Sequence, residues 1–366
     1  MVEWKKLGDL LDYEQPTSYL VNSTEYDESY NVPVLTAGQS LVLGYTNETE
    51  GIYQASKENP TIIFDDFTTS FHWIDYKFKV KSSAMKMLRP KKDVNFRYVY
   101  YAMLGINFVP GGHQRHWISK YSNFEIPIPS LSEQSRIVSI LDTFTSSISN
   151  LKQQIEERRK QYEYERDLLL DLEGKEGVEK ISLKEVCDVI NGRAYSQPEL
   201  LDKGKYRVLR VGNFFSNDNW YFSDLELEDK YYCKNGDLLY AWSASFGPHI
   251  WKEERVIYHY HIWKMECKEK LYVKYMYYWL QSKDMYKQAF SNLHGATMAH
   301  LTKALMESLK VSVPSLQAQS RIVSILDTFE QSISNLEEQL AMREKQYEYY
   351  RNQLLTFEGE EERGKT

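Results

Sequence analysis

Two short stretches of this sequence could support chemistry when each is considered in isolation. His259 and His261 are two positions apart, so on a strand both side chains would lie on one face, as paired metal ligands do. The segment GEEERGKT, from Gly359 to Thr366, matches the phosphate-binding pattern G-x-x-x-x-G-K-[ST]. Neither stretch has the surrounding residues or elements that its chemistry requires. No third ligand follows at zinc-like spacing, and a phosphate loop needs a strand before it and a helix after it. We predict packed histidines and a solvated acidic tail.

Motifs of enzymes that modify nucleotides or bases are also missing. No G-x-G-x-x-G opens a helix after a predicted strand, and no Asn/Asp-Pro-Pro-aromatic string of the adenine-methylating kind occurs. We therefore predict that the chain is not catalytic by itself.

Residue types that recognise nucleic-acid bases occur in both halves of the chain. The segment GGHQRHWISK, beginning at Gly111, joins glycines to His, Gln and Arg, which pair with guanine and adenine edges. The matching segment of the second half, HGATMAHLTK, begins at His294. The residues that we assign to base readout are His113, Gln114 and Arg115 in the first half and Trp242, Ser243, Ser245, His294 and Thr297 in the second. Taken alone, each segment could equally be a polar loop whose histidine forms its hydrogen bonds within the protein.

The charge distribution allows local but not general attraction to DNA. The net charge is −7, so binding to phosphates requires locally basic surface. Residues 77–97 provide such a surface. The phosphate contacts predicted from this stretch are Lys77, Lys79, Lys81, Lys86, Arg89, Lys91 and Lys92. The adjacent carboxylates Asp65 and Asp66 have Ala241 and Trp242 as counterparts, which favours a structural or DNA-facing turn over a metal site.

The elements that must position these residues are revealed by an internal duplication. Residues 129–170 and 314–355 are identical at 29 of 42 aligned positions. The remaining parts of the halves align weakly, at an offset that grows from 176 to 185. We place the additional residues, about nine, after Gly247, around the segment PHIWKEERV. A repeat with only two copies and a domain-length period predicts two domains rather than a solenoid.

Each near-identical copy has the pattern of a long helix. Apolar and long side chains recur at alternating steps of four and three over five heptads, which is typical of a coiled-coil seam. Ser130 and Ser315 follow proline-containing stretches and are plausible N-caps, with Glu133 at the capping-box position in the first copy only. The seam residues proposed for helix pairing and partner binding are Ile137, Leu141, Phe144, Ile148, Leu151, Ile322, Leu326, Phe329, Ile333 and Leu336. An amphipathic helix on a globular core is the alternative.

Geometry predicts the direction of helix pairing. A helix of about 40 residues is about 60 Å long, whereas the linker DLEGKEGVEK reaches at most about 35 Å. The second helix should therefore return antiparallel to the first. We predict an α+β chain with a pseudo-two-fold internal repeat, in which two globular domains of α/β type are separated by two long antiparallel coiled-coil helices. The predicted segments are 1–128 and 181–312 as globular domains, 129–172 and 313–357 as helices, 173–180 as linker and 358–366 as tail.

Composition limits the cellular setting. Cys187, Cys233 and Cys267 show no CxxC spacing and cannot all pair, which fits a reducing compartment, so we interpret them as packing residues. No signal peptide or membrane-length apolar run is present. We predict a cytoplasmic protein that does not contact a membrane.

In combination, these motifs resemble the specificity subunit of type I restriction-modification systems. The resemblance covers essentially the whole chain and is carried by IPIPSLSEQSRIVSILDTF, VSVPSLQAQSRIVSILDTF, NGDLLYAWSASFG and HGATMAHLTK. It implies two target-recognition domains that each read one half of a split target on double-stranded DNA, with the helices setting the gap. The second copy departs from this pattern, because it reads SLQAQ where the first copy reads SLSEQ. This difference puts equal capping of both helices in doubt.

The resemblance also implies a set of partners and a role in bacterial defence. Two methyltransferase subunits would bring S-adenosylmethionine and methylate adenine, and motor-nuclease subunits would use ATP and magnesium, while this chain would bind no cofactor itself. A coiled-coil scaffold that binds only proteins is the alternative, favoured by the acidic charge and the 29 tyrosines. A self-sufficient methylating or restriction enzyme would need motifs that the sequence lacks.

Overall fold

The computed structural model describes residues 2–38, 40–91, 94–111, 114–215, 217–243, 245–290 and 301–357. Two compact units are present: unit 1 comprises Met1–Asn150 with Gln339–Thr366, and unit 2 comprises Leu151–Glu338. Four residues assigned to DNA contact, Lys92, His113, His294 and Thr297, lie outside the described residues, as does the acidic tail. No helix of the described part is long and apolar enough to cross a membrane.

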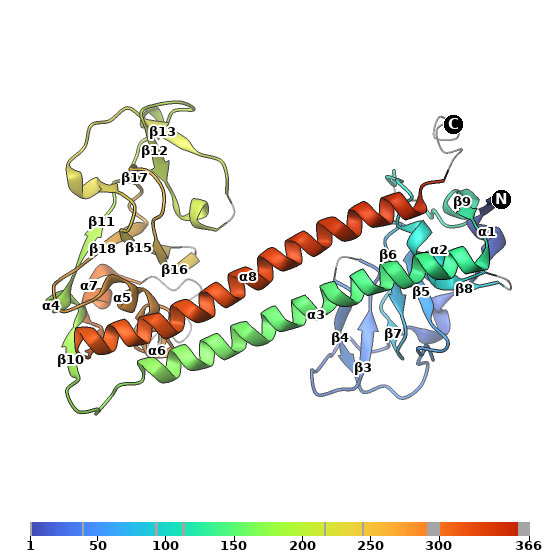
Figure 1. Cartoon of the computed structure of the whole chain (residues 1–366), viewed down its shortest axis with the longest axis horizontal. Coiled ribbons are helices and arrows are strands. Elements are labelled where there is room, and N and C mark those ends of the chain that lie inside the picture. Colours follow the sequence, from blue (N-terminus) through green and yellow to red (C-terminus); the bar gives the residue numbers. More distant parts are fainter. Residues whose placement is uncertain are drawn as a thin grey trace. The chain divides into compact units, whose positions relative to one another are not determined.

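Unit 1 combines three small sheets with one short covering helix (Figure 1). A four-stranded antiparallel sheet has the order β2-β8-β5-β6, a three-stranded sheet has the order β4-β3-β7, and β1 pairs with β9. The elements are β1 (Glu3–Lys6), α1 (Leu7–Leu10), β2 (Leu11–Glu14), β3 (Val32–Leu35), β4 (Val42–Thr46), β5 (Thr61–Asp65), β6 (Phe71–Ile74), β7 (Lys79–Val80), β8 (Met85–Pro90), α2 (Phe96–Met103) and β9 (Glu125–Ile128).

Unit 2 repeats this plan. Its sheets have the orders β11-β18-β15-β16, β13-β12-β17-β14 and β10-β19. In both units a parallel pair, β3 with β7 or β12 with β17, lies within the second sheet. The elements are β10 (Glu179–Ser182), α4 (Leu183–Val186), β11 (Cys187–Asn191), β12 (Tyr206–Leu209), β13 (Tyr221–Ser223), β14 (Tyr232–Cys233), β15 (Leu238–Ser243), β16 (Ser245–Ile250), β17 (Val256–Tyr258), β18 (Ile262–Cys267), α5 (Val273–Trp279), α6 (Lys283–Phe290), α7 (Lys303–Ser308) and β19 (Lys310–Val313). The predicted internal repeat and the α+β class are confirmed.

The additional residues of the second half do not lie where the sequence alignment put them. Leu11 pairs with Pro90 in unit 1 and Cys187 pairs with Cys267 in unit 2, so the offset between the halves is still 176 to 177 at the end of the first sheet. The difference arises later, because 21 residues separate α2 from β9 whereas 30 separate α5 from β19. The insertion therefore follows α5 and includes α6, and the predicted position around PHIWKEERV was wrong.

Two 40-residue helices, α3 (Leu131–Leu170) and α8 (Leu316–Leu355), complete the chain. Both begin at a capped turn, because the Oγ of Ser130 accepts the backbone N–H of Glu133 at 3.4 Å and the Oγ of Ser315 accepts that of Ala318 at 3.3 Å. The carboxylate of Glu133 does not complete a capping box and instead binds Arg136. The two starts are thus capped in the same way despite the sequence difference.

The helices pair antiparallel within each unit. In unit 1 the ring of Phe144 stacks on Tyr350 with centroids 5.3 Å apart. In unit 2 Tyr162 contacts Phe329, whereas Arg159, one turn earlier in α3, binds Glu337, two turns later in α8. Partner numbers fall along α8 as they rise along α3, as predicted from the length of the linker.

The predicted seam is partly a domain core. At the start of α3, Ile137 and Leu141 are fully buried among the sheet and α2 residues of unit 1. At the start of α8, Ile322 and Leu326 are buried in the core of unit 2, with Phe329 and Ile333 against it. These positions fix each helix on its own unit, and Phe329 also contacts Tyr162 of the paired helix.

A repeated set of polar contacts ties each unit to the start of its long helix. Asp142 of α3 accepts from Arg97 (2.8 Å) and Tyr101 (2.5 Å) of α2. Asp327 of α8 accepts in the same way from Lys274 and Tyr278 of α5, each at 2.6 Å. Charge-assisted bonds of this kind are directional, so both units should sit on their helices in the same orientation.

Candidate nucleic-acid interface

Four loops of unit 2 meet at one end of its sheets. The backbone N–H of Arg193, after β11, donates to the carbonyl of Tyr258 (3.1 Å), and that of Tyr260 donates back to Arg193 (3.0 Å). The N–H of Trp242, near the end of β15, donates to the carbonyl of His261, and the N–H of His259 to the carbonyl of Leu209, at the end of β12. These bonds bring segments distant in the sequence into one polar and aromatic surface, which we call the unit 2 loop cluster.

Aromatic rings fill the centre of the unit 2 loop cluster. Trp242 stacks on Trp263 with centroids 5.5 Å apart, and its Nε1–H donates to the carbonyl of Tyr260 at 2.9 Å. That donor is therefore unavailable for reading a base. Tyr260 is 39% exposed and its ring lies against His259 and His261. Exposed aromatic faces held in this way are suited to stacking or wet polar contacts.

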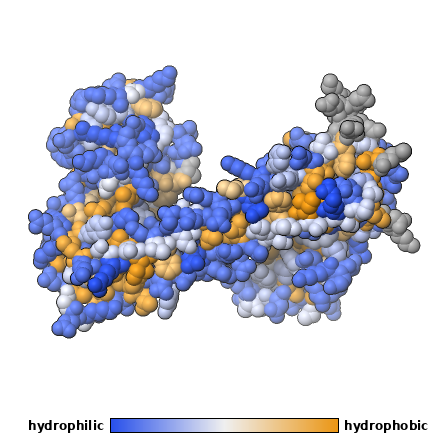
Figure 2. Space-filling view, in the orientation of Figure 1, coloured by the Kyte–Doolittle hydropathy of each residue, from blue (hydrophilic) through white to orange (hydrophobic). Residues whose placement is uncertain are grey.

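Histidine and arginine set the electrostatics of the same cluster. His259 and His261 lie in the turn between β17 and β18 rather than on a strand. Burial, with the neighbouring charges of His261 and Arg210, lowers the pKa of His259 to about 4. His259 is therefore neutral at pH 7 and offers a hydrogen bond rather than a charge. Arg210 is exposed and covers the ring of Tyr221. The surface of unit 2 around β12, β13 and β17 is mainly hydrophilic in Figure 2.

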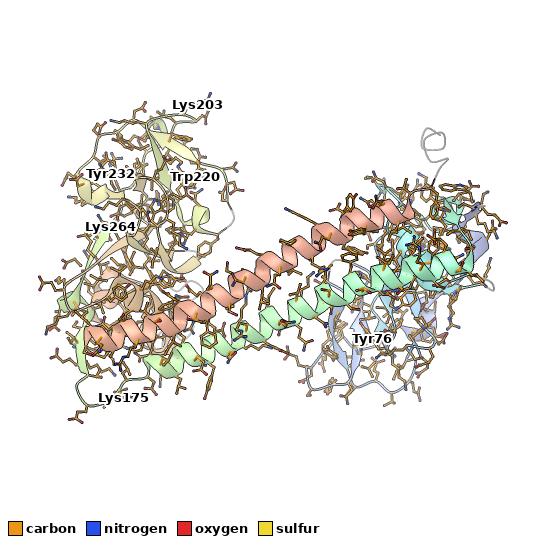
Figure 3. All side chains as sticks on the ribbon, viewed as in Figure 1. Tyr76, Lys175, Lys203, Trp220, Tyr232 and Lys264 are labelled. Atoms are coloured by element: carbon orange, nitrogen blue, oxygen red, sulfur yellow. The ribbon has the colours of Figure 1, made fainter. Side chains whose placement is uncertain are left out.

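The two predicted base-reading serines, Ser243 and Ser245, flank the tip of the β15–β16 hairpin. Ser243 is half-buried, Ser245 is exposed, and the two face each other in the strand register. Ser245 is therefore accessible to a ligand. A cavity of about 840 Å³ in unit 2 lies beside Tyr232 and Lys264, which are labelled in Figure 3. Lys264 donates to the carbonyl of Tyr232 at 3.3 Å and pairs with Glu266 at 2.9 Å, so its charge is compensated within the unit.

In unit 1, carboxylates of the same unit neutralise much of the charge of the basic stretch. This finding corrects two of the predicted phosphate contacts. Lys79 is 2% exposed and binds the carboxylate of Glu48 at 2.7 Å. Burial alone would raise the pKa of Glu48, but hydrogen bonds from Lys79 and from two backbone N–H groups lower it to about 2. Lys86 is 1% exposed and its Nζ lies 3.1 Å from Oδ2 of the buried Asp66. Neither lysine can reach a phosphate.

The remaining basic residues differ in availability. Arg89 binds Glu14 at 3.1 Å and the hydroxyl of Tyr53 at 2.7 Å, and Lys91 donates to the carbonyl of Gly8 at 2.7 Å. Both are partly committed to β2 and its surroundings. Lys77 and Lys81 are exposed, and neither forms an ion pair with a residue that the structure describes. Among the described residues of the stretch, these two lysines therefore have side chains that remain available to a ligand.

The polar segment after Gly111 is anchored by Asp66. The backbone carbonyl of Asp66 accepts the N–H of His116 at 2.8 Å, and its Oδ1 accepts the N–H of Trp117 at 2.8 Å. His116 and Trp117 are buried, whereas Gln114 and Arg115 just before them are exposed. The carboxylate pair is therefore structural, and its effect is to hold two potential base-reading side chains at the surface.

Comparison with known proteins identifies the family. The sequence matches the type I restriction modification DNA specificity domain twice, over residues 1–158 and 175–342. The chain belongs to this specificity family. It is 37% identical over 388 aligned residues to the EcoR124I/EcoR124II specificity subunit of a type I restriction enzyme of Escherichia coli, covering 97% of this chain and 94% of that protein.

Solved structures of the specificity family share the fold. The S subunit of a type I restriction-modification system from M. genitalium superposes with a TM-score of 0.61 at 18% identity, covering 98% of this chain and 96% of the other. A second chain, from a study of complex assembly and conformational transition of the type I R-M system, gives 0.59 at 16% identity, covering 97% and 96%.

Some exposed residues of the unit 2 loop cluster were missed from the sequence. Tyr260 and Arg210 had no motif around them, and His259 and His261 were considered only as metal ligands. The nearest available signal was the density of aromatic and histidine side chains in YHYHIW, from Tyr258 to Trp263. Among the described residues, no group of three or more His, Cys, Asp or Glu side chains could hold a metal.

Proposed function

We propose that this chain is the specificity subunit of a type I restriction-modification complex and that each unit reads one half of a bipartite DNA target. The observation that carries the proposal is the repetition of one sheet topology in two units whose loops differ. Gln114 and Arg115 project from unit 1, whereas Tyr260, Arg210 and Ser245 project from unit 2. Two similar scaffolds with unlike reading residues suit two unlike half-sites.

The domain division and partners form part of the same proposal. Residues 1–128 and 181–312 would be target-recognition domains, with 129–172 and 313–357 as spacer helices, 173–180 as linker and 358–366 as tail. The repeated contacts of Asp142 and Asp327 support two equivalent attachment surfaces for two methyltransferase subunits. S-adenosylmethionine would enter with those subunits, and ATP and magnesium with motor-nuclease subunits. The chain itself would bind no cofactor, catalyse nothing and act in the cytoplasm, where its DNA is.

A coiled-coil scaffold without DNA contact is less well supported. It explains the helices and the acidic net charge, but gives no reason for exposed Lys77, Lys81, Gln114 and Arg115 on one unit. Membership of the DNA specificity family also argues against it.

The deciding experiment is to co-express the chain with its methyltransferase partner and map methylated adenines on a plasmid by long-read sequencing. We expect a split motif with one modified adenine in each half. A soluble complex that leaves no modified motif would contradict the proposed function and favour the protein scaffold.

Substitution in the unit 2 loop cluster should alter one half of that motif only. Tyr260→Ala removes an exposed ring without touching the core, so we expect relaxed or lost sequence preference in one half-site and an unchanged preference in the other. The matched control is Tyr272→Ala, which removes a ring of similar exposure, 43%, at the start of α5. Unchanged preference in both halves would show that Tyr260 does not read bases.

The exposed lysines of unit 1 should contribute affinity without specificity. For Lys77→Ala with Lys81→Ala we expect weaker DNA binding and a salt slope smaller by about two, because each phosphate contact contributes roughly 0.9 to the slope. The measurement is fluorescence anisotropy on cognate and scrambled duplexes at several salt concentrations. An unchanged slope, or a loss confined to the cognate duplex, would contradict the assignment.

A further inference from the structure

Two cysteines of unit 2 face each other across a strand pair. In the antiparallel register of β11 with β18, Cys187 is the direct partner of Cys267. Both are free thiols. The counterpart residues of unit 1, Leu11 and Pro90, occupy the same register position in β2 and β8. The facing thiols are therefore a property of unit 2 alone.

The hydrogen bonds of the strand pair show which kind of position this is. The N–H of Lys268 donates to the carbonyl of Val186 at 2.8 Å, and the N–H of Gly192 donates to the carbonyl of Ile262 at 3.1 Å. The even-numbered residues Val186 and Gly192 thus occupy hydrogen-bonded pairs. Hydrogen-bonded and non-hydrogen-bonded pairs alternate along an antiparallel strand pair, so the odd-numbered Cys187 and its partner Cys267 form a non-hydrogen-bonded pair. Such pairs bring Cα atoms to about 4.5 Å, at the short end of the range of about 4.4–6.8 Å that a disulfide spans.

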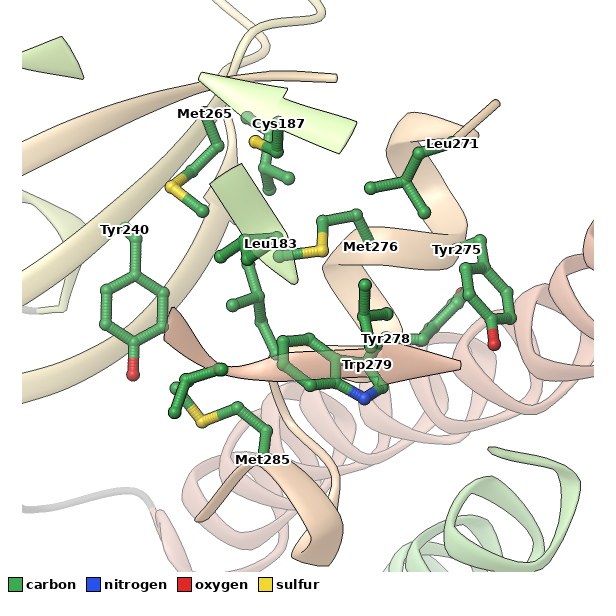
Figure 4. Packing of buried hydrophobic residues seen from close by; sticks show 14 of the residues in the cluster. Leu183, Cys187, Tyr240, Met265, Leu271, Tyr275, Met276, Tyr278, Trp279 and Met285 are labelled. Carbon is green, nitrogen blue, oxygen red and sulfur yellow. The ribbon is translucent and has the colours of Figure 1, made fainter. Parts of the chain in front are cut away.

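The two thiols have different surroundings. Cys187 is 1% exposed and belongs to the core of unit 2, where Figure 4 shows it close to Met265. The adjacent thiol of Cys267, followed by burial, raises the pKa of the Cys187 thiol. Cys267 is only partly buried and lines two cavities, of about 840 and 560 Å³. A small oxidant can therefore reach Cys267 first, and the buried Cys187 is positioned to react with the product.

We propose that Cys187 and Cys267 form a reversible disulfide when the protein meets a peroxide. The Cys267 thiolate attacks one oxygen of hydrogen peroxide, the O–O bond breaks, and hydroxide leaves while Cys267 becomes a sulfenic acid. The Cys187 sulfur then attacks the Cys267 sulfur, the S–S bond forms, and the S–OH bond breaks. The leaving hydroxide takes up the proton of the Cys187 thiol as water. In total, two thiols and one peroxide give one disulfide and two waters.

The position of the pair predicts both the conditions and the effect of this reaction. We expect the glutathione pool of a reducing compartment to keep the two thiols reduced except under oxidative stress. Once formed, it ties the edge strand β11, which leads to Arg193 of the unit 2 loop cluster, to the neighbouring strand β18. The inference concerns thiol chemistry and does not depend on the proposed function.

The test treats the native full chain with hydrogen peroxide, blocks remaining thiols by alkylation and measures intact mass and digested peptides. We expect the number of free thiols to fall from three to one, a loss of about 2 Da before alkylation, and one peptide joining Cys187 to Cys267 that disappears with dithiothreitol. Cys233→Ser is the matched control, because Cys233 is buried opposite Val256 and should leave the cross-link intact.

Two variants and three possible results on the unchanged chain can overturn the proposal. Cys187→Ser and Cys267→Ser should each abolish the cross-link, and persistence of it in either variant would contradict the pairing. If a variant fails to fold, the wild-type protein still decides. Three alkylatable thiols after peroxide, a peptide containing Cys233, or Cys267 oxidised to sulfinic acid without cross-linking would each overturn the proposal.

Discussion

Lys86→Met is expected to lower the free energy of opening of the first sheet of unit 1 by about 3–5 kcal/mol, the usual cost of removing one partner from a buried ion pair. The Nζ of Lys86 lies 3.1 Å from Oδ2 of Asp66, and both side chains are only 1–2% exposed. Without Lys86, the carboxylate would remain buried with no compensating charge. Because Asp66 also anchors His116 and Trp117, the damage should extend to the segment that presents Gln114 and Arg115.

Hydrogen exchange followed by mass spectrometry measures this effect locally. Amides of β5 and β8 should lose roughly 100-fold or more in protection, while peptides of unit 2 serve as an internal reference. Lys77→Met, an exposed lysine of the same basic stretch, should change protection little, since surface substitutions usually stay within about 0.5 kcal/mol. Asp66→Asn combined with Lys86→Met should recover part of the loss. Normal protection with weakened DNA binding would instead restore Lys86 as a phosphate contact.

The basic stretch shows where sequence reasoning succeeds and where it stops. A concentration of lysines and arginines within 77–97 is visible in the sequence, but their acidic partners are not. Glu48 lies 31 positions before Lys79, and Asp66 lies 20 before Lys86. Strand pairing alone brings these groups together. Formal charge in a sequence window therefore overstates surface charge wherever a sheet supplies counter-charges from elsewhere.

The helices were predictable because their determinants are local. The capping serines Ser130 and Ser315, the heptad spacing and the length of the linker all act within a few turns, and the antiparallel direction followed from them. What the pattern did not distinguish was the partner of each apolar residue. Ile137 and Ile322 continue the seam in sequence but pack on domain cores in the structure, because heptad positions a and d look the same whichever apolar surface covers them.

The loop cluster and the insertion were harder for the opposite reason. Tyr260 and Arg210 come to lie on one surface only because four segments that are not consecutive in the sequence pair with one another. No local sequence pattern predicts this pairing. The insertion was misplaced because the halves are nearly unrelated between Gly247 and α5. Strand register located the insertion where residue identity did not. The pair Leu11–Pro90 of unit 1 corresponds to the pair Cys187–Cys267 of unit 2.

Lengthening both long helices by one heptad should widen the gap between the two halves of the DNA target. Seven residues inserted after Asn150 in α3 and seven after Glu338 in α8 add about 10.5 Å to each helix, at about 1.5 Å per residue, and keep the seam in phase. At about 3.4 Å per base pair, this corresponds to roughly three additional base pairs between the half-sites. The half-site sequences should be unchanged, because the insertions fall in the long helices beyond the contacts of Asp142 and Asp327 and leave both recognition units intact.

Methylation mapping after co-expression with the methyltransferase partner reads the gap and both half-sites in one experiment. The control variant carries the heptad in α3 only, which puts pairs such as Arg159 with Glu337 out of register and should abolish methylation instead of changing the spacing. The informative comparison is between these two variants, because they share the inserted heptad of α3 and differ only in whether α8 is lengthened as well. A wider gap with intact half-sites in the double insertion would identify the paired helices as the element that sets the spacing. An altered half-site, or an unchanged gap despite active methylation, would mean that the spacing is determined within the recognition units themselves.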